Sequence, residues 1–78
     1  MSRSHAEKVA RALNAHHART CAGFYPATGG RAFGARVVKG VLEITYNFRN
    51  FTPVDATTFA AHDHNGRPIS LPKQEIAQ

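Results

Sequence analysis

The sequence predicts a small α+β domain in which one N-terminal helix packs on an antiparallel sheet of about four strands, arranged as two hairpins. Three observations support this prediction. Apolar and polar residues alternate from Phe33 to Phe48, which indicates a half-buried hairpin. An alanine-rich amphipathic segment near the N-terminus has a small apolar side that can lie close against a sheet. A turn signal at residues 63–66 divides a second apolar stretch.

The predicted helix begins at His5 and ends between residues 19 and 22. Ser4, followed three residues later by Glu7, forms a capping box at its start, and Gly23 is the expected stop residue. At helical spacing, one side should face the sheet with Ala6, Val9, Ala10, Leu13 and His17. The opposite side forms a basic stripe with Lys8, Arg11, Ala15 and Arg19.

The first hairpin, residues 33–48, turns at Lys39-Gly40. A two-residue turn there pairs apolar residues on the core face: Val37 with Leu42, Ala35 with Ile44, and Phe33 with Tyr46. The same register sets Arg36 opposite Glu43 on the other face, and a slip by one residue would exchange the two faces. Phe48 continues the core face. The open face is expected to carry Arg36, Glu43, Thr45, Asn47 and Arg49.

Residues 23–32, which precede this hairpin, read as a loop because they contain Pro26 and the pair Gly29-Gly30. Its aromatic residues Phe24 and Tyr25 either fold onto the core, which we favour from the usual location of large aromatic side chains, or form an exposed contact. Further along, Pro53 cannot donate to a central ladder, so the strand that contains it ends there or lies at an edge.

A second hairpin is predicted over residues 57–71. Asp63 and Gly66 occupy the first and fourth positions of a type I turn with a bulge. This turn pairs Ala61 with Ile69 and Phe59 with Leu71. A two-residue loop at Asn65-Gly66 is the alternative, and it matches the two faces less well.

Size and composition indicate one domain, residues 1–78, with residues 1–3 and 73–78 expected to fray. The N-terminal residues are polar and show neither a signal peptide nor a transmembrane segment, so we expect a cytoplasmic protein. Cys21 is the single cysteine, which suits a reducing compartment. Ten Lys and Arg against five Asp and Glu give a net charge of +5, which favours acidic partners.

No motif in the sequence carries a defined chemistry. His16, His17, His62, His64 and Cys21 match no standard zinc-finger spacing, so we predict neither a metal nor a cofactor. Cys21 with a histidine, oriented by Asp55 or Asp63, is a weak candidate for nucleophilic catalysis, and we do not predict an enzyme. The segment Thr28-Gly29-Gly30-Arg31 lacks the ending of a phosphate-binding P-loop.

The basic residues are the remaining functional candidates. The predicted binding surface consists of Lys8, Arg11, Arg19, Arg31, Arg36, Arg49 and Arg67, with Tyr25 and Phe51 as aromatic contacts. We therefore expect a noncatalytic binding protein that docks on an acidic macromolecule, either nucleic acid, a nucleoprotein or an acidic protein face. The alternative is a small phage- or mobile-element-type inhibitor that blocks a host or defence complex, in the manner of an anti-CRISPR protein. An open sheet face or unpaired edge is also compatible with a homodimer.

Overall fold

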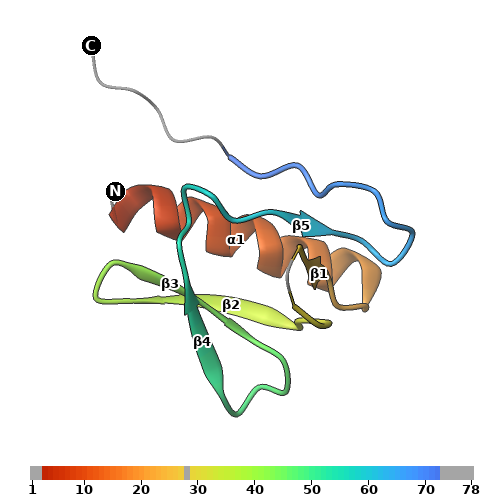
Figure 1. Ribbon diagram of the computed structural model, residues 1–78, viewed down its shortest axis with the longest axis horizontal. Coiled ribbons are helices and arrows are strands. Elements are labelled where there is room, and N and C mark those ends of the chain that lie inside the picture. Colours follow the sequence, from red (N-terminus) through yellow and green to blue (C-terminus); the bar gives the residue numbers. More distant parts are fainter. Residues whose placement is uncertain (1–2, 28, 73–78) are drawn as a thin grey trace.

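The computed structural model describes residues 3–27 and 29–72. Its elements are α1 (Arg3–Thr20), β1 (Tyr25–Pro26), β2 (Gly34–Val38), β3 (Val41–Thr45), β4 (Phe51–Val54) and β5 (Ala61–His62). Strands β2, β3 and β4 form one antiparallel sheet in that order, while β1 and β5 form a separate antiparallel pair. The α+β class with an N-terminal helix on an antiparallel sheet is confirmed (Figure 1), although the strands divide into three and two rather than into two hairpins. The tails expected to fray lie outside the described residues, apart from Arg3, with which α1 begins.

Helix α1 packs against β2 and β3 with the side that the sequence pattern predicts. Its four small and aliphatic inner residues, Ala6, Val9, Ala10 and Leu13, are buried, whereas Lys8, Arg11, Ala15 and Arg19 are exposed. The alanines let the helix lie close to the sheet, since they add almost no bulk between the two layers. The predicted start is wrong by two residues: Ser4 lies within the helix instead of at its N-cap.

The C-terminal end of α1 is also built differently from the prediction. Cys21, with φ 52°, adopts the left-handed conformation that commonly follows a helix, and its N–H donates to the carbonyl of His17 at 2.8 Å. Gly23 is therefore not the stop residue. It is buried, and a Cβ there would collide with the carbonyl oxygen of Ala32 and lie 2.7 Å from Cγ of Arg31. Gly23 is required because residues Arg31 and Ala32 approach its backbone closely.

The register of the β2–β3 hairpin is confirmed. Val37 pairs with Leu42, Ala35 with Ile44, and Arg36 with Glu43. Lys39 and Gly40 form the turn with φ of 53° and 79°, the two positive values that a type I′ turn needs. The paired strands end one residue pair earlier than predicted, at Gly34 and Thr45, so Phe33 and Tyr46 lie outside them.

The core forms where this sheet, α1 and the 24–32 segment meet. Leu42 and Ile44 are buried on the inner face, as predicted, and Phe24 is the largest fully buried side chain. Two assignments from the alternating pattern are wrong. Phe48 is 62% exposed because the chain leaves the strand after Thr45, and Thr45 itself, expected on the open face, is 1% exposed.

The second hairpin is reduced to its tip. The predicted turn is confirmed: Ile69 N–H donates to the carbonyl of Ala61, and Gly66 has the positive φ, 82°, that the bulge requires. The return arm forms only an isolated bridge to β5, and β5 pairs instead with β1. The Asp63 carboxylate accepts the backbone N–H groups of Arg67 and Asn65. These hydrogen bonds, chiefly the one from Arg67, lower the pKa of the Asp63 carboxyl below its usual value.

Both outer strands of the three-stranded sheet have protected edges. The side-chain amide of Asn14 donates to the carbonyl of Ala35 at 2.9 Å and accepts from its N–H at 2.8 Å. The backbone groups of Ala35 thus point away from β3, toward the helix. Because backbone direction alternates along an antiparallel pair, Ile44 and its partner Thr52 bond to each other, and Pro53 lies with its missing N–H at the free edge of β4. Asn14 and Pro53 therefore hinder the addition of a further strand.

Candidate functional site

The seven predicted basic residues are all exposed, but they do not form one surface. Lys8, Arg11 and Arg19 lie along the outer side of α1, and Arg67 follows the turn after β5. Arg31 and Arg49 lie in the loops on either side of the β2–β3 hairpin. The predicted surface thus separates into groups, and the contacts of each group decide which of them is available to a partner.

The Arg36 side chain already interacts with neighbouring side chains of the same sheet. Its Nε donates to Oε1 of Glu43 at 2.9 Å, and its guanidinium lies 3.6 Å from the centroid of the Phe51 ring. Phe51 is half-buried under this cation. Tyr25, the other predicted aromatic contact, is 39% exposed on β1. A cation that already neutralises a carboxylate and covers a ring contributes less to binding an outside anion.

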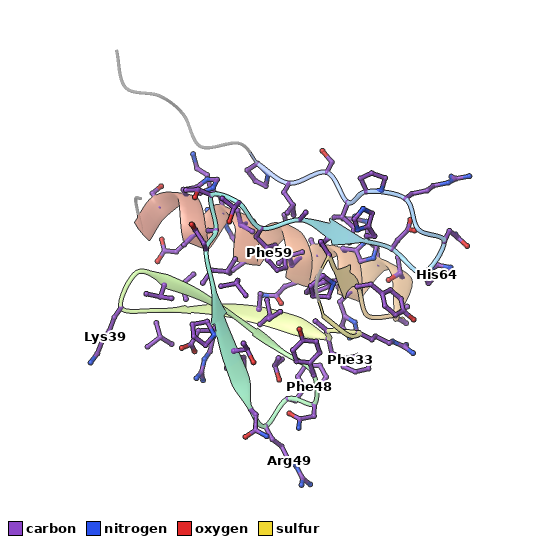
Figure 2. The ribbon with its side chains drawn as sticks, in the orientation of Figure 1. Phe33, Lys39, Phe48, Arg49, Phe59 and His64 are labelled. Atoms are coloured by element: carbon purple, nitrogen blue, oxygen red, sulfur yellow. The ribbon has the colours of Figure 1, made fainter. Side chains whose placement is uncertain are left out.

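Arg31 contacts a cluster of aromatic rings that was not predicted from the sequence, and Arg49 directly follows one of its members in the chain. The rings of Phe33 and Phe48 have centroids 5.8 Å apart, and His17 lies 5.9 Å from Phe33 and 6.1 Å from Phe48. The Arg31 guanidinium lies 5.0 Å from the centroid of the Phe33 ring. Figure 2 shows Phe33, Phe48 and Arg49 at the same end of the molecule, well apart from Lys39. We call these five residues, His17, Arg31, Phe33, Phe48 and Arg49, the aromatic–arginine patch.

The loop that carries Phe48 is fixed by hydrogen bonds from side chains to its own backbone. Oγ1 of Thr45 accepts the N–H of Phe48 at 2.7 Å. Oδ1 of Asn47 accepts the N–H groups of Arg49 and Asn50 at 2.8 and 2.9 Å. Phe48 and Arg49 are therefore presented in a defined geometry before any partner arrives, which reduces the ordering cost of binding.

Phe48 occupies a backbone conformation that does not suit it. Its φ is 62°, in the left-handed region that glycine and asparagine adopt readily and that costs a bulky residue on the order of 1–3 kcal/mol. Its ring extends over Gly34, where an added Cβ would lie 3.5 Å from Cε1 of Phe48. A loop that only had to turn would be better served by glycine, so strain at an exposed aromatic side chain favours a binding role.

The part of the sequence that contains the patch residues is mostly basic. Between Lys8 and Val54 the chain contains seven Lys or Arg and a single acidic residue, Glu43. That carboxylate is bonded to Arg36 on the sheet. The net charge of +5 attracts anions over a distance of about a Debye length, roughly 8–10 Å in physiological salt.

Sequence reasoning missed the aromatic part of this patch for a definable reason. The alternating pattern continues through Phe48 and therefore predicts a core position for it. The signal that separates Phe48 from the strand is the pair of asparagines around it, Asn47 and Asn50, since asparagine favours turns over strands. The contact between His17 and Phe33 had no sequence signal, because it depends on how the helix end meets the sheet.

The histidines are dispersed rather than gathered. Nε2–H of the buried His5 donates to the carbonyl of Ala56 at 3.2 Å, and Nδ1–H of His17 donates to the carbonyl of Ala22 at 3.0 Å. His16 is buried and His64 exposed. Within residues 3–27 and 29–72, no group of three or more His, Cys, Asp and Glu is arranged to hold a metal ion.

A separate hollow of about 530 Å³ opens on the inner face of β3 and β4, where α1 does not cover the sheet. Ile44, Val54 and Phe59 give it an apolar lining, and Asp55 contributes a carboxylate. This carboxylate accepts the hydroxyl and the N–H of Thr57 at 2.7 and 3.0 Å, which lowers the pKa of Asp55. Its ionised form is thus stabilised by its own turn, an arrangement that suits a structural cap better than a general base.

No helix in the described part of the chain is long and apolar enough to cross a membrane. Comparisons with family models, curated proteins and solved structures found no match. The aromatic–arginine patch is the surface of the described residues from which a function can be inferred.

Proposed function

We propose that this chain is a noncatalytic binding protein that docks its aromatic–arginine patch on an acidic macromolecule. The observation that carries the proposal is Phe48, whose ring is 62% exposed although its backbone is held in a strained conformation. Arg49 follows it in the chain, and Arg31 lies over the neighbouring ring of Phe33. Exposed aromatic and arginine side chains on a preorganised loop are typical of binding surfaces.

Arg31 and Arg49 have fewer internal commitments than the other candidate cation on the sheet. Arg36 forms an ion pair with Glu43, whereas the guanidinium of Arg31 lies 5.0 Å from the centroid of the Phe33 ring. The contribution of Lys8, Arg11 and Arg19 on α1 is long-range attraction rather than contact with the same ligand, because they lie along the outer side of the helix.

Binding to defined polyanions tests the proposal. Fluorescence anisotropy with an RNA strand, a DNA duplex and polyglutamate, each at several salt concentrations, should show affinity for at least one of them. We expect the double variant Arg31→Gln, Arg49→Gln to weaken that affinity and to reduce its salt dependence. For a nucleic acid the logarithmic salt slope should fall by about 0.7–0.9 for each phosphate that the variant no longer neutralises.

Lys39→Gln provides the matched control. Lys39 is also exposed and also carries one positive charge, but it lies at the tip of the β2–β3 hairpin, away from the patch (Figure 2). Combined with Arg67→Gln, it removes the same total charge as the double variant. If the control pair weakened binding as much as the patch pair, net charge rather than the patch would be responsible. If none of the three polyanions bound in low salt, the proposal would be wrong.

A protein inhibitor is the second candidate, and a different surface favours it. Val38 and Val41 pair with each other on the β2–β3 hairpin and are 38% and 40% exposed, so they form a small apolar area on the outer sheet face. An inhibitor that covers another protein's working surface could use it. Such a protein would ignore all three polyanions and form one stable stoichiometric complex with its target, which Val41→Asp would disrupt.

The proposal includes a cytoplasmic location and is compatible with a homodimer. The protected edges of β2 and β4 argue against dimerisation by strand addition, so a dimer would use the outer sheet face around Val38 and Val41. Sedimentation of wild-type protein and Val41→Asp at several concentrations separates a dimer through this face from a monomer.

A further inference from the structure

We infer that the acidic partner of the aromatic–arginine patch is a single-stranded nucleic acid, and that one base stacks on the exposed face of Phe48. This inference rests on the proposed function and makes it specific. It assigns each part of the patch to a part of a nucleotide. Phe48 takes the base, and Arg31 and Arg49 contact the phosphates on either side.

The exposed ring is what favours a single strand over other polyanions. Bases in a duplex are stacked on one another and hide their faces, whereas bases of a single strand can stack on aromatic side chains. An acidic polypeptide has carboxylates but no flat ring in every repeating unit, so it would use the arginines and leave Phe48 in water. Only an unpaired strand offers regularly spaced negative charges together with flat apolar faces.

The arrangement of the rings supports stacking as well. Phe33 and Phe48 are inclined by 35° with centroids 5.8 Å apart, and His17 meets Phe33 edge-on at 89°. Phe33 and His17 thus support Phe48 from the protein side and leave the other side of its ring to solvent. A base placed there would extend an aromatic series that the protein has already built.

The cations are positioned for a backbone that passes the ring. Arg49 is the next residue after Phe48, and its N–H is fixed by Oδ1 of Asn47. Arg31 comes from a different loop, and its side chain crosses Gly23, where any Cβ would lie 2.7 Å from Cγ of Arg31. The two cations come from two separate segments, and we assign one phosphate contact to each of them, on either side of the base stacked on Phe48.

Tryptophan fluorescence gives a direct test, because the chain contains no tryptophan. Phe48→Trp keeps an aromatic ring and places a single fluorophore in the patch. Val41→Trp places one on the outer face of the distant hairpin, where the native residue is 40% exposed. Titration with a ten-nucleotide RNA or DNA strand should quench the first variant and leave the second unchanged. A strand of the same length with abasic sites should bind without comparable quenching.

The affinity of Phe48→Ala completes the test. Because this ring is mostly exposed, the variant should fold, which the thermal melting curve checks. We expect single-strand affinity to fall by on the order of tenfold or more, with the salt slope unchanged, because the variant cannot stack a base but still neutralises the same phosphates. Binding by Phe48→Trp should match the wild type.

The outcomes distinguish failure of the single-strand inference from failure of the proposed function. If natural and abasic strands bound equally, Phe48→Ala had no effect, and Arg31→Gln with Arg49→Gln still weakened binding, the single-strand inference would be wrong and the proposed function would stand. The same conclusion would follow if polyglutamate or duplex DNA bound more tightly than the single strand. If no polyanion bound at all, both would be overturned.

Discussion

Asn14 should stabilise the fold and also keep the sheet from adding further strands. Its amide makes two hydrogen bonds with the backbone of Ala35, at 2.8 and 2.9 Å. Asn14→Ala removes both. At about 1 kcal/mol net for each bond, the loss is about 2 kcal/mol. Alanine is the better helix former by roughly 0.6 kcal/mol, so we expect a net destabilisation of about 1–1.5 kcal/mol.

In a domain of this size, each 1 kcal/mol lowers the melting temperature by about 4–8 °C. The Asn14→Ala variant should therefore melt roughly 4–12 °C below the wild type in a thermal unfolding experiment followed by circular dichroism. Arg11→Ala, also on α1 and exposed, is the control, and its effect should remain within about 0.5 kcal/mol.

The same substitution should affect association, because it leaves the N–H and C=O of Ala35 free at the edge of β2. We expect Asn14→Ala to self-associate more strongly than the wild type in sedimentation at increasing concentration. A variant as stable as the wild type, with unchanged sedimentation, would show that the Asn14 contacts are not what protects this edge.

Three further predictions follow from contacts in the sheet and its loops. Pro53→Thr gives the free edge of β4 an N–H donor and should increase self-association in sedimentation; a variant that sediments like the wild type would contradict the edge assignment. The pKa of Asp63 is lowered by folding, so its contribution to stability is complete above about pH 4 and is lost as pH falls through the folded value. Asp63→Asn should accordingly reduce the dependence of the melting temperature on pH between about 5 and 2, whereas an unchanged acid limb would place the effect elsewhere. Thr45→Val keeps the shape of a buried side chain but removes the acceptor for Phe48 N–H, so urea denaturation should show a loss of about 1–2 kcal/mol; no loss would mean that water replaces this bond without cost.

The β2–β3 hairpin could be predicted from the sequence because two independent patterns required the same register. In this register the apolar residues pair with one another on the inner face, and Arg36 pairs with Glu43 on the outer face. The turn at Lys39-Gly40 left no freedom to slip. The inner side of α1 was predictable for a similar reason, since helical spacing and burial agree from Ala6 to Leu13.

The errors arose where short-range hydrogen bonds or distant contacts outweighed the pattern. Thr45 ends β3 because its hydroxyl accepts the N–H of Phe48, which turns the chain although the alternation continues. The pairing of β1 with β5 joins Tyr25 to His62 over a long stretch of sequence, and two-residue strands carry too little pattern to be recognised. The residue that ends the helix in the left-handed conformation is Cys21, whereas Gly23 is explained by its close packing against Arg31 and Ala32.

The candidate site was predictable in its charges and not in its assembly. Arg31 and Arg49 are predictable as exposed cations, but the rings of the patch come from α1, from the segment before β2 and from the loop after β3. Only the folded chain brings His17, Phe33 and Phe48 together. The hydrogen bond from Phe48 N–H to Oγ1 of Thr45 ends β3, and this end of the strand leaves Phe48 exposed to solvent next to Arg49 in the chain. A chain in which Phe48 had stayed in the strand would have buried that ring and kept a basic surface with nothing for a base to stack on.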